Sequence, residues 1–404
     1  QFGFVANGTA VMSVDTVVIK DISNDAIYKN GSGTMTIGTA IVEKNTTAKS
    51  ARYGVHMMNG KLTIGNLSIR DTGNTCINQT GGTSEFSNVT IQDHANSHSV
   101  KMTVGTMTIH GGTIGKSNSN NVRTEGTSVL NLFGNVTING TKGNNALCIT
   151  ANSKLNIGSA EKVCNLTVNN ANQAAIAVNH DTTGKAGVVS AAGSTVTVNN
   201  AKYGIHAASE AQIQLSNMVT NGVTDKSIYA LGKANVTILS GTFGTTQGAM
   251  NIETQGSASL SLSNATIVST STATWTHGND KINTPVHIYS SGSASLDNVT
   301  ITGGIFGIRV HTCKNVTLND VEIRNAASHG IFMQNSPTVK VTGQLKIVNA
   351  GSRGIQVNSG TFDGSNADKI EIIDPSSVGI ENGGTVTTNN LSITTTKQTP
   401  TYSH

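Results

Sequence analysis

Polar and aromatic side chains recur in pairs across the second half of the chain. The two members of each pair are two residues apart, and the pairs are Asn251 with Glu253, His287 with Tyr289, Arg309 with His311, Phe332 with Gln334, and Gln356 with Asn358. Amide, imidazole, guanidinium and ring side chains at regular spacing suit hydrogen bonding to, and stacking on, an extended chain rich in hydroxyl or carboxyl groups. The pattern therefore indicates a binding surface; the alternative is a solvated sheet face enriched in these residues by chance.

The segment between the pair at Asn251 and the pair at His287 is longer than the segments between the later pairs, and it contains the only tryptophan of the chain. Its excess length falls in a loop insertion, residues 269–283, which includes Trp275 and His277. Insertions in repetitive folds map to turns and often border a binding face. We therefore expect Trp275 and His277 to overhang the pairs, unless the tryptophan only covers an exposed edge of the core. The predicted ligand-binding residues are Asn251, Glu253, Trp275, His277, His287, Tyr289, Arg309, His311, Phe332, Gln334 and Gln356.

An internal repeat predicts the elements that present these side chains. A small residue followed by an apolar, a variable and another short residue recurs most clearly at Gly54, Ala175, Gly204, Gly307, Gly330, Gly354 and Gly379. Weaker copies, one of them aligned on Ala249, bring the total to about fifteen, with a mean spacing near 25 residues. Such a period is the signature of a stacked repeat fold, in which each repeat is one turn.

Two further segments of each repeat alternate apolar and polar residues. Examples are Leu62/Ile64 followed by Leu67/Ile69, and Val316/Leu318 followed by Val321/Ile323. Alternation at period two places the apolar residues inside and the intervening polar residues outside. Each turn therefore has three short strands. We predict one domain over residues 1–404, with residues 1–25 as a cap or first turn and residues 395–404 as a tail.

Asparagine recurs between the second and third strands of the repeat, at Asn66, Asn88, Asn135, Asn165, Asn217, Asn264, Asn298 and Asn390. Asparagine tolerates left-handed turn conformations, and its amide can bond to the amide of the next turn. We interpret this column as structural. Several of these residues begin N-x-T triplets, but the threonine is the outward residue of the third strand.

The pattern GIxV…VxL…NVTI resembles the repeat of pectate lyases, polygalacturonases and bacterial surface adhesins, over roughly residues 20 to 395. The resemblance implies an all-β fold, a right-handed three-stranded parallel β-helix of about fifteen coils. This scaffold carries lyases, hydrolases, phage tailspikes, autotransporter passenger domains and the binding regions of serine-rich-repeat adhesins, so it does not itself specify a function. The low charge and the abundance of Thr, Asn and Gly are most similar to the adhesins.

Catalytic patterns are incomplete. A hydrolase similar to polygalacturonases needs carboxylates crowded on one face, whereas Glu253 and Glu381 lie five turns apart in the predicted outer columns. The triplet at His329 matches the polygalacturonase Gly-His-Gly element only in part. Pectate lyases need a calcium-binding acid cluster, and Arg309 has no such acids beside it in sequence. We therefore expect no catalytic residues, no metal site and no cofactor.

Composition narrows the remaining classes. Charged residues are 12% of the chain and scattered, with a net charge of +4, so the basic runs of a nucleic-acid-binding protein are missing. No stretch has transmembrane length, and Gln1 opens no signal peptide, which suggests a fragment of a larger protein. Cys148 and Cys164 are candidates for one disulfide; the alternative is that Cys76, Cys148, Cys164 and Cys313 are all thiols.

The leading interpretation is a secreted or bacterial cell-surface adhesin module. It would bind a glycan or a host-surface glycoprotein along one face, either as a monomer or associating side by side. The alternatives are a polysaccharide lyase or glycoside hydrolase on the same scaffold, and a passive spacer rod. Because free histidine titrates near pH 6.5, exposed His287 and His311 beside Arg309 would make binding of an anionic glycan tighter at lower pH.

Overall fold

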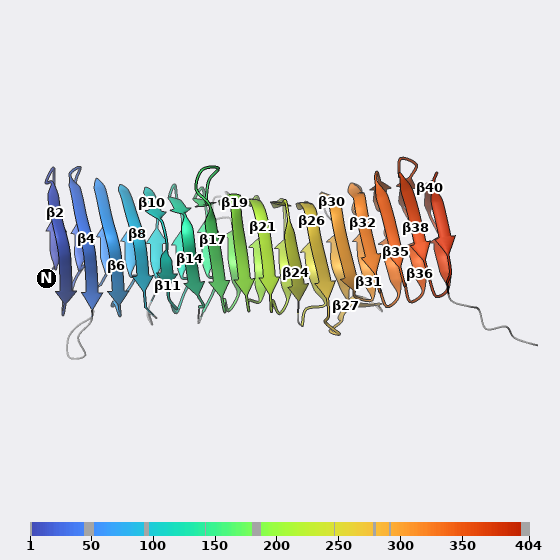
Figure 1. Ribbon diagram of the computed structural model, residues 1–404, viewed down its shortest axis with the longest axis horizontal. Helices are drawn as coiled ribbons and strands as arrows, with labels where there is room; N and C mark the ends of the chain where they lie inside the picture. Colours follow the sequence, from blue (N-terminus) through green and yellow to red (C-terminus); the bar gives the residue numbers. More distant parts are fainter. Residues whose placement is uncertain are drawn as a thin grey trace, which may run out of the picture. The chain divides into compact units, whose positions relative to one another are not determined.

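The computed structural model describes residues 2–43, 52–92, 97–141, 143–179, 187–245, 247–277, 280–290 and 292–396 (Figure 1). These residues form strands and turns, and none of them belongs to a helix long and apolar enough to span a membrane. The chain divides into two compact units, residues 1–219 and 220–404. Both units have the architecture predicted from the sequence, a stack of turns made of parallel strands.

In the first unit, each turn contributes one short strand to a sheet that we call sheet A. Its strands are β1 (Phe4–Ala6), β3 (Ile27–Lys29), β5 (Val55–Met57), β7 (Ile77–Gln79), β9 (Val100–Met102), β12 (Val122–Thr124), β15 (Leu147–Thr150), β18 (Ala174–Asn179) and β20 (Tyr203–Ala207). The rest of each turn forms sheet B, which bends around the other two faces. Its strands are β2 (Met12–Lys20), β4 (Thr34–Glu43), β6 (Lys61–Arg70), β8 (Thr83–Ile91), β10 (Thr106–Ile109), β11 (Gly112–Ile114), β13 (Val129–Leu132), β14 (Gly134–Asn139), β16 (Lys154–Ile157), β17 (Cys164–Asn169), β19 (Val188–Asn199) and β21 (Gln212–Asn221).

The second unit repeats this plan and adds one hairpin. Sheet A here consists of β22 (Lys226–Ala230), β25 (Met250–Thr254), β29 (Thr284–Tyr289), β31 (Phe306–His311), β33 (His329–Gln334), β36 (Arg353–Val357) and β39 (Val378–Asn382). Sheet B consists of β23 (Asn235–Ile238), β24 (Gly241–Thr245), β26 (Ser259–Ser269), β30 (Ser293–Gly303), β32 (Val316–Arg324), β34 (Thr338–Val341), β35 (Gln344–Val348), β37 (Thr361–Gly364), β38 (Lys369–Ile373), β40 (Thr385–Thr388) and β41 (Leu391–Thr394). The hairpin pairs β27 (Trp275–His277) with β28 (Asp280–Ile282) in antiparallel orientation.

The core is a set of stacked apolar columns. In sheet A of the second unit, one column contains Ile252, Val286, Ile308, Ile331 and Ile355, which pair in register from turn to turn and are fully buried. Burial of each such side chain contributes about 1.5–3 kcal/mol relative to exposure. The inward direction predicted for these isoleucines is therefore confirmed, and with it the outward direction of the residues between them.

Long strands of sheet B bend at the predicted asparagines. Asn264 and Asn298 have φ values of 46° and 53°, a left-handed conformation that turns the strand from one face to the next. The Nδ2 of Asn298 donates to the Oδ1 of Asn264 at 2.8 Å, and Asn165 donates to Asn135 in the same way at 3.0 Å. These bonds support the structural interpretation of the asparagine column.

Candidate functional site

The outer face of sheet A in the second unit brings most of the predicted site residues together. One column contains Glu253, His287, Arg309, Phe332, Gln356 and Glu381, each paired in register with the next. A second column contains Tyr289, His311 and Gln334. The alternation predicted from the sequence is correct from His287 onward.

The structure corrects the predicted register of the turn before His287. Glu253 pairs with His287, so it lies in the first column, whereas Asn251 lies two positions earlier in the strand. Asn251 occupies the position that glycine fills in later turns, such as Gly307. Its side chain is buried, and Nδ2 donates to the carbonyls of Phe243 and Val268 at 3.0 and 3.2 Å. Asn251 is thus a corner residue rather than a surface ligand.

Several residues expected at the surface are buried. His287 and Arg309 are fully buried, and His311 and Phe332 are nearly so, although all four point away from the core. By contrast, Trp275 is 39% exposed, and Tyr289, Gln334 and Gln356 are half-buried. The outward direction predicted for these four side chains is correct. Their predicted exposure is wrong, because neighbouring side chains on the sheet contact and cover one another. We call the accessible group, Trp275, Tyr289, Gln334 and Gln356, the Trp275 face.

A ladder of polar contacts runs along the first column. Arg309 Nη1 lies 3.0 Å from His287 Nε2, Arg309 Nη2 donates to Gln334 Oε1 at 2.9 Å, and His287 Nδ1 lies 3.3 Å from Glu253 Oε1. Arginine can only donate, so Nε2 of His287 accepts. The proton of a neutral His287 is then on Nδ1 and faces the carboxylate, which fixes both the tautomer and the orientation of the ring.

Glu253 ends the ladder as a buried acid. Gln255 Nε2 donates to its Oε1 at 2.8 Å, and Lys226 Nζ lies 3.5 Å from its Oε2. Burial alone raises the pKa of Glu253, but the hydrogen bonds of His287 and Gln255, together with the charge of Lys226, lower it overall. Glu253 therefore belongs to the ladder as a carboxylate. Lys226 begins β22 and Gln255 directly follows β25, and neither belongs to the pairs predicted from the sequence.

The insertion reaches the ladder through Trp275. Asn283 Nδ2 donates to the carbonyls of Ser271 and Ala273, at 2.8 and 2.6 Å, and so fixes the start of the loop. The centre of the Trp275 ring lies 6.3 Å from that of His287. Figure 1 shows β27 beside the strand ends of β26 and β30. The predicted overhang is thus observed for Trp275, whereas the side chain of His277 lies outside the described part of the structure.

A row of rings connects the two columns. His287 and Tyr289 have ring centres 5.7 Å apart, and Tyr289 and His311 are 4.7 Å apart. Asn335 Nδ2 lies 2.6 Å from His311 Nε2, and Thr312 Oγ1 lies 2.9 Å from His311 Nδ1, so both ring nitrogens are engaged. Both histidines are therefore positioned to hold Tyr289, and neither presents the exposed titrating nitrogen that the sequence suggested.

Beyond Phe332 the face becomes an aromatic and charged cluster that the sequence did not indicate. Phe306 stacks on Phe332 with ring centres 4.9 Å apart, and His329 contacts both rings. Arg353 contacts His329 and forms an ion pair with Glu381. His329 is the first residue of β33. The repeat gives no signal for it, because the residue before the repeat glycine varies from turn to turn.

Comparison with known proteins agrees with this architecture. Residues 199–368 match the family model described as right handed beta helix region. The chain is a right-handed parallel β-helix of about fifteen turns. No curated protein and no solved structure matched it. The matched stretch includes every residue of the Trp275 face and of the ladder beneath it.

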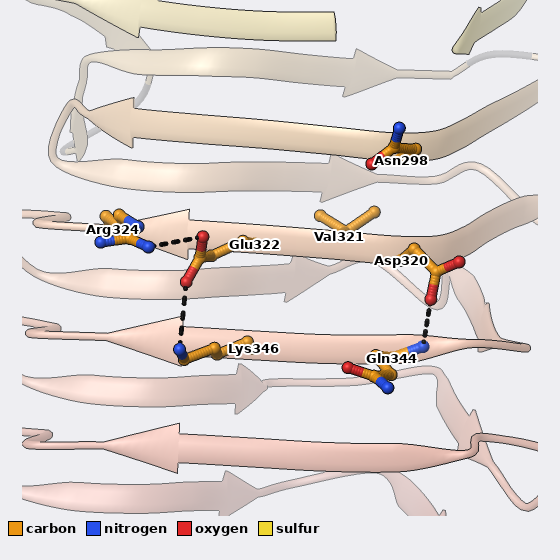
Figure 2. A pocket seen from close by; sticks show the side chains of 7 residues that line it. All are labelled: Asn298, Asp320, Val321, Glu322, Arg324, Gln344 and Lys346. Carbon is orange, nitrogen blue, oxygen red and sulfur yellow. Dashed lines mark hydrogen bonds and ion pairs between the residues drawn. The ribbon is translucent and has the colours of Figure 1, made fainter. Parts of the chain in front are cut away.

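Another face of the β-helix has a polar pocket of about 440 Å³, on sheet B of the second unit (Figure 2). Figure 2 shows Glu322 between Arg324 and Lys346, with N···O distances of 2.8 and 3.4 Å. Asp320 accepts a hydrogen bond from the backbone of Gln344 at 3.0 Å. Since these charges already pair with one another, a ligand would have to displace them, and we regard the Trp275 face as the stronger candidate.

The described residues contain neither a metal-binding cluster nor a disulfide. Across the described ranges, no three side chains of His, Cys, Asp or Glu gather in a way that could hold a metal ion. Cys148 and Cys164 are both free and buried, as are Cys76 and Cys313. The alternative of four thiols is therefore the one observed. Burial raises the pKa of Cys76 to about 12 and that of Cys164 to about 11, which makes both thiols unreactive.

Proposed function

We propose that this β-helix is a carbohydrate-binding module of an extracellular adhesin, and that its ligand lies across the Trp275 face. The supporting observation is that two ring side chains, Trp275 and Tyr289, remain accessible beside a network of buried polar residues. Aromatic rings offer an apolar surface, and a sugar ring presents C–H groups on its faces and hydroxyls at its edge. Stacking would therefore orient the sugar, and edge contacts would select it.

The half-buried amides supply suitable edge contacts. Gln334 uses Oε1 to accept from Arg309, which leaves its Nε2 as a donor. Gln356 donates to Asn358 at 2.8 Å, and its Oε1, which accepts from His329, has a second lone pair for a ligand. An amide donor and an amide acceptor in successive turns match the alternating hydroxyls of an extended glycan.

The buried ladder acts indirectly in this proposal. Glu253, His287 and Arg309 bond to one another, so they hold the overlying rings in one orientation without touching the ligand. A surface locked in its binding geometry loses less conformational entropy on binding. We therefore expect substitutions in the ladder to affect stability first and affinity second.

The setting of the module is part of the same proposal. A secreted or bacterial cell-surface protein that binds a glycan, or a host-surface glycoprotein, suits a fold with a long outer face and a low density of charge. We propose no cofactor, no nucleic-acid partner and no membrane insertion for these residues. The sole buried acid of the ladder is engaged by Gln255, His287 and Lys226, so we assign it a structural rather than a catalytic role.

The test is a glycan array with the full chain, followed by calorimetry with the strongest ligand. Trp275→Ala and Tyr289→Ala should each weaken binding about tenfold or more, which corresponds to about 1.4 kcal/mol. Tyr203→Ala is the matched control, because Tyr203 is a half-buried sheet A tyrosine of the first unit. Equal affinity of all three variants would contradict the proposal.

The two alternatives give different results in the same experiment. A polysaccharide lyase or hydrolase would release unsaturated or reducing ends from the bound polysaccharide, and this release would be measured during incubation. A spacer rod would bind no glycan on the array. Binding without turnover, sensitive to Trp275, is the outcome that the proposed function requires.

A further inference from the structure

A second cluster of rings lies on the first turns of the first unit, far along the sequence from the Trp275 face. It consists of Phe2, Tyr28, Tyr53 and His56, with Asp25 and Arg52 beneath and beside them. Tyr28 and His56 are neighbours in sheet A, paired in register between β3 and β5. Only 15 residues of the chain are Phe, Trp or Tyr, so three of them around one histidine is a strong local concentration.

Asp25 anchors this cluster. Its carboxylate is fully buried and accepts from Arg52 Nε and Nη2, both at 2.9 Å, while His56 Nδ1 lies 2.7 Å away. Burial raises the pKa of Asp25, but the hydrogen bonds of His56 and Arg52, together with the charge of Arg52, lower it overall. Asp25 is thus an acceptor, and His56 directs its Nδ1 proton toward it.

This arrangement leaves the other nitrogen of His56 without a bond in the described part of the chain, and the residue is 8% exposed, so only a group that inserts between the rings can reach it. Within the described residues, Nε2 of His56 has no hydrogen-bond partner. In the neutral ring Nε2 carries a lone pair, so it can accept a proton from a hydroxyl group. The buried acid therefore fixes an acceptor at the base of the cluster.

The rings surround this acceptor and remain accessible. The centres of Tyr53 and Tyr28 lie 4.8 and 5.4 Å from that of His56, and Phe2 lies 5.0 Å from Tyr28. Phe2 is 44% exposed, and both tyrosines are half-buried. The Arg52 guanidinium lies over the Tyr53 ring at 4.7 Å. Flat, accessible rings around a single acceptor form a platform on which a ligand ring can stack.

Charge indicates which kind of ligand fits. The negative Asp25 and the positive Arg52 form a two-bond pair, so their charges largely cancel at the platform. An anionic ligand would find little net positive field there. A neutral sugar needs none, since it offers C–H groups for stacking and hydroxyls for His56.

We propose that Phe2, Tyr28, Tyr53 and His56 form a second carbohydrate-binding site, which takes a neutral sugar residue. One sugar face stacks on an accessible ring, that of Phe2 or of Tyr28, whose planes are tilted by 40° to each other, and one hydroxyl donates to Nε2 of His56. The site is independent of the Trp275 face, because none of its residues belongs to the second unit.

The test uses the full chain carrying Trp275→Ala, so that the first site is weakened. Cellohexaose and chitohexaose serve as neutral probes and an oligogalacturonate as the anionic probe, with saturation-transfer NMR for contact and calorimetry for affinity. At least one neutral probe should bind, and adding Phe2→Ala or Tyr28→Leu should weaken it at least tenfold. Phe2 is exposed, so Phe2→Ala tests the contact without endangering the fold.

Each result has a distinct meaning. If the Trp275→Ala chain binds no neutral probe, or binds the anionic probe more tightly, the second site as proposed is wrong. If neutral binding survives Phe2→Ala and Tyr28→Leu unchanged, it is wrong as well. Failure of the first proposal is separate, since it appears as full binding on the array by Trp275→Ala together with Tyr289→Ala. His56→Phe keeps a ring and removes the acceptor, so it should weaken binding while the stacking signal persists.

Discussion

Replacing Arg309 with methionine should destabilise the surrounding turns strongly. The guanidinium is fully buried, lies 3.0 Å from His287 Nε2, donates to Gln334 at 2.9 Å, and lies over the Phe332 ring at 5.9 Å. Methionine retains much of the packing but leaves the acceptors of His287 and Gln334 without this donor. A buried acceptor left unsatisfied costs about 1–3 kcal/mol, so two of them cost about 2–6 kcal/mol. Two hydrogen bonds to a charged donor, at about 1.5–3 kcal/mol each, give a similar range.

Arg123→Met is the matched control. Arg123 also points outward from sheet A, but its side chain is 37% exposed, and it pairs with Glu125 at 2.8 Å. An exposed ion pair is worth about 0.2–1 kcal/mol, so this variant should unfold almost like the wild type.

The measurement combines urea unfolding, followed by circular dichroism, with hydrogen exchange. Repeat proteins open locally, so exchange should accelerate in β29, β31 and β33 of Arg309→Met and not in the first unit. If Arg309→Met and Arg123→Met lose the same stability, then Arg309 is a surface residue after all, and the ladder does not hold the Trp275 face.

Three further outcomes are expected. Ile331→Asp places a charge between Ile308 and Ile355 and should abolish the β signal of several turns in circular dichroism, whereas Lys340→Asp, on the surface of the same turn, should not. The pKa of Glu253 is lowered from its ordinary 4.5, so its stabilising contribution is present above that value and disappears as the pH falls; the melting temperature of Glu253→Gln should change less with acid than that of the wild type. A thiol reagent at pH 8 should leave the native chain unlabelled and label four cysteines in denaturant, while labelling of two would reveal a disulfide.

Features that depend on neighbouring residues in the chain were predictable. The inward direction of Ile308 and Ile331 follows from period-two alternation, which any parallel stack of strands must obey. The corner at Asn264 and Asn298 follows from the left-handed conformation that asparagine tolerates. The alternation recurs along the chain, so each copy supports the next, whereas the left-handed conformation occurs at two of the eight predicted asparagines, Asn264 and Asn298.

The register at Asn251 was not predictable from the repeat alone. A Cβ atom at the glycine position of later turns would clash, as at Gly307 with the side chain of Ile323. Asn251 occupies this position by directing its amide to the carbonyls of Phe243 and Val268. Small residues are therefore favoured at this position because space is limited, but a residue that bonds to the corner carbonyls also fits. The repeat pattern requires a small residue, so it places Ala249 at the glycine position in place of Asn251.

Exposure was harder to predict than direction, and two histidines show why. His56 and His287 both point outward, and both place Nδ1 beside a buried carboxylate, of Asp25 and of Glu253 respectively. The residue in register on the next turn differs, because Arg309 follows His287 while Asn78 follows His56.

An arginine at that place reaches back to Nε2, closes the ladder and leaves ligand contact to the rings above it. An asparagine there makes no such bond to His56, so Nε2 remains an acceptor. Within one scaffold, the side chain one turn further along thus decides whether an acid-oriented histidine supports a binding surface or takes part in binding. Placing an arginine next to His56 should therefore give it the role of His287: Asn78→Arg should engage Nε2 of His56 and abolish its proposed contact with a sugar hydroxyl.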